Sequence, residues 1–480
     1  MTLLADLGAL LPEIALVIGA VALLTYGVFQ GEESRDDLVS ILCVGLLLGA
    51  VALVASTGGA AAAAFDGAFR IDAFSQFSKA IIFGAAAFAI LMSADASPTG
   101  ALKRFEYPVL IVLASVGMSL MVSANDLIAL YMSIETQSLA LYVLAAFNRD
   151  SRRSTEAGLK YFVLGALSSG LLLYGASLVY GFAGSTSFPA IAAVATGPAA
   201  SPGLVVGLVF VICGLAFKVS AAPFHMWTPD VYEGAPTPVT AFFAAAPKVA
   251  AMALFARALV GAFPEAVADW RPVIAMIAVA SMAVGSVSAI VQTNIKRLLA
   301  YSSIGHMGFA LVGLAAGTED GVAGVLIYMS IYVVMTVGSF ACVLMMRRQG
   351  GRTENISDLS GLATTDKGLA LILGVLLFSL AGVPPTGGFF GKLFVFAAAV
   401  ETGMIWLAVV GVLMSAIAAF YYLRIVKIIW FDDAAPAFLR EGGARLGLIA
   451  SLAAALMLPG LLFLIAPLQA AANTAAASLF

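Results

Sequence analysis

The sequence has little charge, few cysteines and only two histidines. Of its 480 residues, 11% are charged, whereas a soluble domain carries about 25%. The low charge excludes an ordinary soluble domain. The net charge is −3 and there is no basic tail or acidic run, so nothing indicates a nucleic-acid partner.

The three cysteines, Cys43, Cys213 and Cys342, all lie in apolar runs. Their spacing fits neither a disulfide framework nor a metal site, so we expect no metal and no iron–sulfur cluster in this chain. The segment before Lys392 looks like a phosphate loop, but Thr386 replaces the first required glycine and Leu393 the final Ser or Thr. We therefore expect no cofactor-binding residues.

Hydrophobic residues make up 62% of the chain. They are concentrated in runs of the length that crosses a bilayer as a helix, about 20 residues. The pattern predicts an all-α polytopic membrane protein with about fourteen transmembrane helices. The first run has no basic residues before it, so we expect a retained helix and not a cleaved signal. The runs are 7–29, 38–56, 73–93, 106–123, 126–147, 158–182, 203–222, 238–263, 272–292, 298–316, 321–346, 368–401, 403–430 and 446–471.

The basic residues fall on alternate loops. Of the 24 Lys and Arg, only Arg70 and Arg271 lie in even-numbered loops. Since basic residues favour the cytoplasmic side, we expect both termini in the periplasm of a bacterial inner membrane. The odd-numbered loops hold Arg35, Lys103, Arg104, Arg149, Arg152, Arg153, Lys160, Lys296, Arg297, Arg347, Arg348, Arg352, Lys367, Arg440 and Arg445.

Two of the predicted spans are interrupted. The seventh has Pro223 shortly after Lys218, and the twelfth contains Pro384 and Pro385 between glycines. Proline and adjacent glycines break a helix. Unwound backbone at membrane depth is tolerated only against protein or a wet cavity, and paired broken helices are typical of transporter sites.

Four charged side chains lie deep in apolar runs: Glu135, Lys218, Lys248 and Lys392. Each costs about 2.5 to 3.5 kcal/mol at mid-membrane even on lenient scales, so the pattern indicates an ion or proton pathway. Two unit charges about 4 Å apart interact by roughly 4 kcal/mol at an effective dielectric of 20. Bringing Glu135 close to Lys218 would thus hold the lysine charged. A structural ion pair is the alternative for Glu135.

The two histidines are weaker candidates. His306 could link proton sites in the two halves of the chain, and a hydrogen-bonded core histidine is the alternative. His225 follows the first break, where we expect it to stabilise the break. We expect Asp230 and Glu233, in the same loop, to cap and order that loop.

Three segments carry a family resemblance. Residues 218–238, 294–303 and 380–392 are similar to the signature segments of the antiporter-like membrane subunits of respiratory complex I. The variant Tyr232-Glu-Gly favours one paralogous complex I subunit over the cation/proton antiporters. Little sequence follows the fourteenth run, so we do not expect the long lateral helix of the largest antiporter-like subunit.

The resemblance implies two inverted five-helix repeats, helices 4–8 and 9–13, with helices 7 and 12 broken. The corresponding domains are 1–105, 106–263, 264–430 and 431–480. It implies that Glu135, Lys218, Lys248 and Lys392 match the proton-channel positions. Some paralogues have histidines and a lysine where this chain has Tyr328, Tyr332 and Thr336, so a central relay here must use His306, hydroxyls or water.

The resemblance also implies a function. The chain would translocate protons in the membrane arm of an NADH–quinone oxidoreductase, beside other antiporter-like and small membrane subunits. NADH, FMN, the iron–sulfur clusters and quinone would be bound by partner subunits. The alternatives are a subunit of a multi-subunit sodium/proton antiporter and a structural anchor that conducts no ions.

Overall fold

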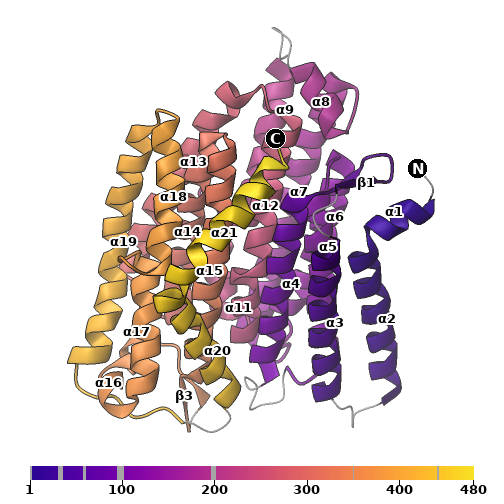
Figure 1. Ribbon diagram of the computed structural model, residues 1–480. Helices are drawn as coiled ribbons and strands as arrows, with labels where there is room; N and C mark the ends of the chain where they lie inside the picture. Colours follow the sequence, from indigo (N-terminus) through magenta and orange to yellow (C-terminus); the bar gives the residue numbers. More distant parts are fainter. Residues whose placement is uncertain are drawn as a thin grey trace.

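The computed structural model describes residues 3–30, 36–57, 61–94, 102–195, 202–349, 351–439 and 443–480. Long helices run side by side from α2 at one edge to α19 at the other, and the last helix, α21, crosses the bundle diagonally (Figure 1). Thirteen candidate spans lie in the described residues. The shorter helices α17 and α18 together supply one more, broken span. This agrees with the prediction of about fourteen.

The first half of the chain contains the following elements: α1 (Leu3–Ala9), α2 (Leu11–Gln30), α3 (Asp36–Ser56), β1 (Ala62–Ala64), β2 (Phe69–Ile71), α4 (Ala73–Ala94), α5 (Glu106–Ser123), α6 (Leu127–Ala145), α7 (Arg152–Ala183), α8 (Phe188–Ala195), α9 (Pro202–Val219), α10 (Thr228–Gly234), α11 (Thr237–Ala244) and α12 (Ala246–Ala262).

The second half continues with these elements: α13 (Val267–Ile290), α14 (Ile295–Ala316), α15 (Glu319–Met345), β3 (Arg347–Arg348), β4 (Gly351–Arg352), η2 (Ile356–Leu359), α16 (Leu362–Thr365), α17 (Lys367–Ala381), α18 (Gly387–Glu401), α19 (Ile405–Phe431), α20 (Ala444–Ala455), η3 (Leu456–Gly460) and α21 (Leu461–Ala477). Strands β1 and β2 form one antiparallel hairpin, and β3 and β4 form another.

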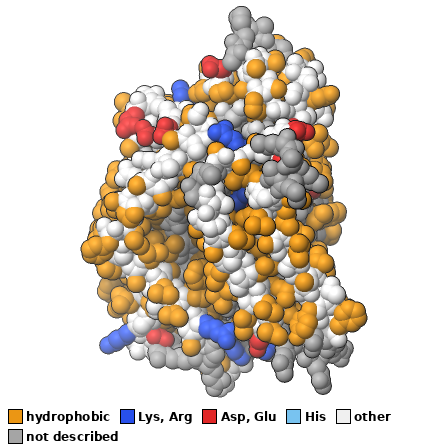
Figure 2. Space-filling model, turned by 45° about the vertical axis from the view of Figure 1, so that its right-hand side comes forward, with side chains coloured by type: hydrophobic (Ala, Val, Ile, Leu, Met, Phe, Trp, Pro, Cys, Tyr) orange, Lys and Arg blue, Asp and Glu red, His pale blue; other side chains and the backbone are white. Residues whose placement is uncertain are grey.

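The helices form an inner and an outer layer. The span Thr237–Ala262 is wholly buried within the chain, and α14 and α15 are nearly so. Helices α2, α3, α7 and α19 expose most of their length. Exposed apolar side chains cover the middle of the face in Figure 2, and charged side chains gather toward its two ends. This is the surface expected of a protein whose outer helices face lipid.

Polar caps set where several inner helices begin. The Asp126 side chain accepts hydrogen bonds from two backbone N–H groups of α6, and Asn294 does the same for α14. Thr318 accepts one from α15. Such caps satisfy N–H groups that a helix start leaves free. They lie at the ends of the bundle, where the chain enters and leaves its spans.

Both predicted breaks are confirmed. Helix α9 ends at Val219, and the next helix begins only at Thr228. Helix α17 ends at Ala381 with Gly382 in the left-handed region (φ 84°), and α18 begins at Gly387. A Cβ at Gly388 would lie 1.8 Å from the carbonyl oxygen of Ser379, so only glycine allows the two half-helices to meet this closely.

Other boundaries differ from the prediction. The eighth span breaks at Ala245, where the chain turns between α11 and α12 just before Pro247. The fourteenth span, predicted as straight, is interrupted at 456–460 around Pro459. Proline lacks the N–H that a continuous helix needs, and neither proline was used in predicting the span boundaries.

Helix α7 begins at Arg152, so Arg152, Arg153 and Lys160 lie in a helix and not in a loop. Arg35 and Arg440 lie outside the described residues.

The loops with many basic residues meet at one end of the bundle, called here the basic face. Lys160 and Arg297 each pair with Asp230 at 2.8 Å. Lys296 pairs with Glu354 at 3.2 Å. These contacts join the fifth, seventh, ninth and eleventh connections, and β3 marks this end in Figure 1. The opposite end holds Arg271, which donates to the backbone of α14.

Candidate functional site

Lys248 lies at the first break and not in the middle of a continuous helix. Its ammonium donates a hydrogen bond of 3.1 Å to the carbonyl of Val219, the last residue of α9, and another to Ser220. The side chain is only 1% exposed. The C-terminal end of a helix has free carbonyl groups and a partial negative charge, so it favours a cation. The break in α9 thus creates the binding site for this ammonium.

Lys218 and Lys248 lie on either side of an aromatic pair. The Lys218 ammonium lies 5.8 Å from the Phe217 ring centroid, and that of Lys248 lies 5.2 Å from the Trp227 ring. The Phe217 and Trp227 centroids are 5.6 Å apart. Aromatic faces stabilise nearby cations by cation–π attraction. The two lysines therefore belong to one local site, as their sequence separation alone does not indicate.

Glu135 and Lys218 do not form an ion pair with each other. Ser169 donates a hydrogen bond to the Glu135 carboxylate, and Lys218 donates one of 2.8 Å to Ser138. Glu135 and Ser138 lie three residues apart on α6, which places them on one side of that helix. In the structure Glu135 and Lys218 are therefore not in direct contact, and each is hydrogen-bonded to a serine hydroxyl.

Lys392 repeats the arrangement at the second break. Its ammonium donates hydrogen bonds of 2.8 Å to the carbonyl of Ala381, the last residue of α17, and to Ser415. It also lies 4.7 Å from the Phe309 ring centroid, and the side chain is 5% exposed. Both broken spans therefore end in a carbonyl that holds a buried lysine.

His306 lies within a cluster of hydroxyl groups contributed by α14, α15 and α19. Its Nδ1 is 2.7 Å from the Tyr328 hydroxyl and its Nε2 is 3.2 Å from that of Tyr422. Tyr422 also bonds to Ser302. The residue is 2% exposed. His306 is thus a hydrogen-bonded core histidine, and its partners are groups that can pass a proton onward.

A small cavity adjoins this cluster. It measures about 10 Å³, close to the least space that holds one water molecule. It reaches Ala244, beside the break before α12, and Leu380, beside the end of α17. Four of its lining residues carry hydroxyl groups, and Ser302 also belongs to the cluster around His306. The four are Ser302, Tyr332, Thr336 and Ser339.

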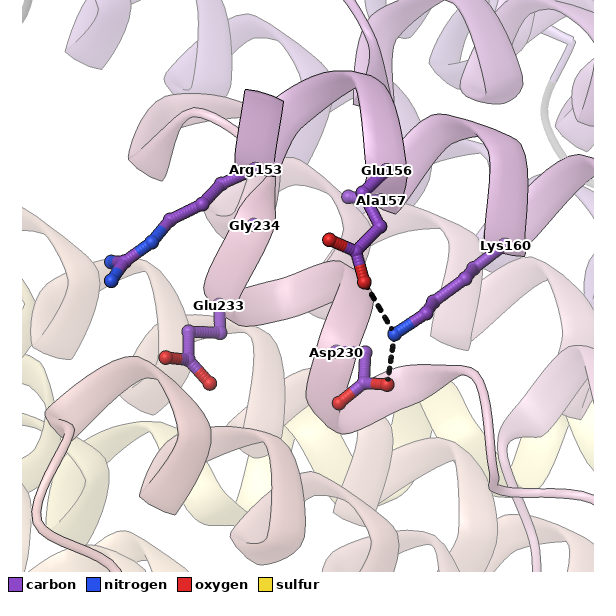
Figure 3. Close-up of a pocket in the computed structure, with 7 residues that line it drawn as sticks. All are labelled: Arg153, Glu156, Ala157, Lys160, Asp230, Glu233 and Gly234. Atoms are coloured by element: carbon purple, nitrogen blue, oxygen red, sulfur yellow. Dashed lines mark hydrogen bonds and ion pairs between the residues drawn. The ribbon is translucent and has the colours of Figure 1, made fainter. Parts of the chain in front are cut away.

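Polar cavities open at the basic face. In one of about 190 Å³, the Lys160 ammonium lies between the carboxylates of Glu156 and Asp230, at 2.8 Å from each (Figure 3). The pKa of Asp230 lies below its usual value, because hydrogen bonds from Lys160 and Arg297 outweigh the opposing effect of burial. Asp230 therefore joins three elements, in addition to the loop-ordering role predicted for it.

A larger cavity of about 650 Å³ lies beside it. The buried Lys296 ammonium there donates to the carbonyls of Glu233 and Ala235, at 2.9 and 2.8 Å. Both cavities are lined by Glu233 and Gly234 of α10, the helix that follows the first break.

His225 is in the turn between α9 and α10. Burial lowers its pKa, and a hydrogen bond to the Pro223 backbone partly offsets this.

Sequence reasoning missed two buried ion pairs. Lys79 and Glu13 lie 2.6 Å apart, with both side chains at most 4% exposed. Arg257 and Asp72 also lie 2.6 Å apart, each 1% exposed. Lys79, Arg257 and Glu13 stand inside predicted apolar runs, which is the same signal that singled out Glu135. A search of the sequence for every charged residue inside an apolar run would have found Lys79, Arg257 and Glu13.

A mainly helical membrane bundle in which two of the broken spans each meet a buried lysine is typical of an antiporter-like membrane protein. Residues 124–418 match a family model described as NADH:quinone oxidoreductase/Mrp antiporter, TM. NADH-quinone oxidoreductase subunit N 1 of Rhizobium meliloti is 54% identical over all of this chain and 99% of its own length. Subunit N of Parvibaculum lavamentivorans is 59% identical over 90% of this chain and 89% of its own. The chain belongs to the NADH-quinone oxidoreductase subunit N family.

Solved structures give the same result for the fold. A chain of respiratory complex I from Thermus thermophilus is 33% identical, with a TM-score of 0.80 over 96% of this chain and 99% of that one. A chain of the Mrp complex from Dietzia sp. DQ12-45-1b has a TM-score of 0.83 over 98% and 97% at 24% identity, which shows a shared fold. The family that the sequence motifs predicted is confirmed.

Proposed function

We propose that this chain is a proton-translocating membrane-arm subunit of a bacterial NADH–quinone oxidoreductase. The observation that carries the proposal is the repeated contact between a buried lysine and the end of a broken helix, Lys248 with Val219 and Lys392 with Ala381. Relatives of more than half identity over nearly the full chain bear the name of this subunit. NADH, FMN, the iron–sulfur clusters and quinone belong to partner subunits.

Each lysine can exchange a proton when its contact with the helix end changes. The dipole of a helix end stabilises a cation by about 0.3–1 kcal/mol, and by up to about 2 kcal/mol in partly buried geometries. A free-energy change of about 1.4 kcal/mol alters proton affinity tenfold. Small movements of the unwound segment after Val219 or Ala381 therefore suffice to load or unload the lysine.

The proposed path enters at the basic face. Water in the cavities beside Lys160 and Lys296 leads to Lys218 and Lys248. From there the cavity beside Thr336 and the hydroxyls around His306 lead to Lys392. Glu135 adjusts the charge of the Lys218 site, and movement of its carboxylate toward Lys218 holds that lysine protonated. Each step uses groups that the fold holds within one bundle.

The membrane placement and the internal repeat belong to the same proposal. The basic face lies in the cytoplasm and both termini lie in the periplasm of the inner membrane, as the distribution of Lys and Arg favours. Helices α5–α12 and α13–α19 form the two inverted units, corresponding to 106–263 and 264–430. The matching lysine contacts at their breaks support this division.

Co-purification tests the proposed function. A tagged chain extracted from native membranes should bring down proteins with flavin and iron–sulfur absorbance, together with NADH–quinone activity. The alternative is a sodium/proton antiporter subunit, and the fold shared with the Dietzia Mrp complex is compatible with it. Recovery of membrane partners only, without flavin or iron–sulfur centres, would favour that alternative and overturn the proposal.

A further inference from the structure

A groove with apolar walls lies between α4, α15 and α20, away from the lysine sites. Its volume is about 270 Å³. Ser330 contributes the one hydroxyl among its lining residues and donates it to the carbonyl of Leu326, so no polar group in the lining needs a partner. Four residues frame the groove: Gly84 and Phe88 on α4, Val337 on α15 and Leu452 on α20.

The interruption at 456–460 produces this groove. Beyond the interruption α21 runs diagonally across the bundle, while α20 descends separately toward the basic face (Figure 1). Ile449, Leu452 and Ala453 of α20 therefore form one wall together with Leu456 of η3, and leave a space in front of α15. The space is a consequence of how the last span is built.

The position of the groove matches one leaflet of a bilayer. Counting 1.5 Å per residue, it begins roughly 8–12 Å from the helix ends at the basic face and extends to roughly 18–22 Å. The hydrocarbon core is about 30 Å thick, so the groove runs from beneath the headgroups to about the midplane. Phe88 is 42% and Leu452 56% exposed beside it, which leaves the groove open at the protein surface.

The groove suits a short, narrow apolar occupant. Its lining residues span about 11 Å along the helices, roughly two helical turns. A segment of a single hydrocarbon chain matches this length and these apolar walls. Each methylene group that packs against the apolar walls gains dispersion contacts that an open groove lacks, so binding of the chain is favourable.

A basic residue lies near the end of the groove that is closer to the basic face. Arg445 lies in the first turn of α20, four, seven and eleven residues before Ile449, Leu452 and Leu456, so it shares the helix face that lines the groove. Its side chain is exposed and makes no ion pair with the described part of the chain. A guanidinium binds phosphate through paired N–H donors. Helical side chains lean toward the N-terminus, which is toward the headgroups here.

We propose that this groove binds one acyl chain of an anionic glycerophospholipid from the leaflet at the basic face, with its phosphate on Arg445. The site goes beyond proton translocation. The lipid packs on α15, the helix that also presents Tyr328 to His306. Its presence thus stabilises the position of an element of the proposed relay.

Gly84 provides a direct test. A Cβ at this position meets no atom within 4 Å, and Gly84 lines the groove, so the side chain of Gly84→Leu can extend into the groove. Gly49 on α3 is equally open, and Gly49→Leu is the matched control. Leucine is also a better helix former than glycine in both places. If Gly84→Leu fails to assemble, Ala80→Leu narrows the groove from one turn away on the same helix.

The measurement is native mass spectrometry of the assembled complex, purified in mild detergent and incubated with either phosphatidylglycerol or phosphatidylcholine. Wild type and Gly49→Leu should retain one more phosphatidylglycerol than Gly84→Leu. Arg445→Gln should lower the apparent affinity for phosphatidylglycerol about fivefold. It should lower that for phosphatidylcholine less, because the choline cation offsets the charge of the phosphate. An equal phosphatidylglycerol count in Gly84→Leu and wild type overturns the site. An unchanged affinity in Arg445→Gln overturns the assignment of the anionic headgroup.

Discussion

The Lys392 ammonium lies 2.8 Å from the carbonyl oxygen of Ala381, the residue at which α17 ends. Lys248 makes the corresponding contact with Val219 at the end of α9. The first contact joins the two halves of one broken span, and the second joins neighbouring spans. In both, an interrupted helix presents its carbonyl end to a buried lysine. This arrangement gives each half of the chain a buried lysine held by a helix end.

Replacing Glu135 with glutamine should slow proton pumping and leave assembly intact. The amide of Glu135→Gln can still accept the hydrogen bond from Ser169, but it removes the negative charge that can hold Lys218 protonated. Dye quenching in inverted membrane vesicles measures the pumping rate, and native gels measure assembly. Loss of the assembled complex would instead identify Glu135 as a structural partner.

Tyr328→Phe should also slow pumping. The change removes the hydroxyl 2.7 Å from His306 Nδ1 and keeps the ring that packs beside it. A single hydrogen bond contributes only about 1 kcal/mol to stability, so the chain should still fold. Tyr174→Phe is the control, because Tyr174 is 56% exposed. Equal pumping rates in the two variants would exclude the Tyr328 hydroxyl from the relay.

The Arg257–Asp72 pair should matter for stability. Arg257→Met leaves the buried Asp72 carboxylate with Arg70 as its remaining cation, at 3.3 Å and with a side chain that is 44% exposed. Because that partly solvated arginine compensates only part of the charge, we expect a loss smaller than the roughly 3–5 kcal/mol of a fully unpaired buried charge. Adding Asp72→Asn should recover much of this, since the amide oxygen can still accept from the backbone N–H of Ser75. The measurement is the fraction of detergent-solubilised protein that remains monodisperse after heating, compared between wild type and the single and double variants.

The exposed pair of Lys427 with Asp432 is the control for that series. Lys427 is 63% exposed, and surface pairs contribute about 0–1 kcal/mol. Lys427→Met should therefore leave the thermal midpoint almost unchanged. If the Arg257→Met single variant were as stable as wild type, the buried pair would have no structural role.

Sequence reasoning was strongest where composition and helix breakers decide the structure. The spans follow from apolar length. The break after Lys218 follows from Pro223, and the break before Lys392 from two prolines flanked by glycines. It was weakest where the signal is tertiary. Lys248 was predicted in mid-helix, because the turn at Ala245 depends on packing between α11 and α12. The bond from Lys218 to Ser138 joins residues 80 positions apart, which no local pattern indicates.

The missed ion pairs illustrate the same limit. Lys79 and Arg257 were visible as charges in apolar runs, but their partners, Glu13 and Asp72, lie in other helices or connections. Pairing them requires knowing which helices are neighbours. The hydroxyl cluster around His306 likewise combines α14, α15 and α19. Its proposed role in proton transfer stays a prediction.

The proton-to-electron ratio of the Lys248→Ala complex tests the central claim most directly. The complex is reconstituted in sealed vesicles, and protons moved per NADH oxidised are compared with wild type and with Lys103→Ala, which changes an exposed lysine. We predict that Lys248→Ala lowers the ratio or abolishes pumping, while Lys103→Ala matches wild type. A Lys248→Ala complex with the wild-type ratio and rate would contradict proton transfer through this lysine.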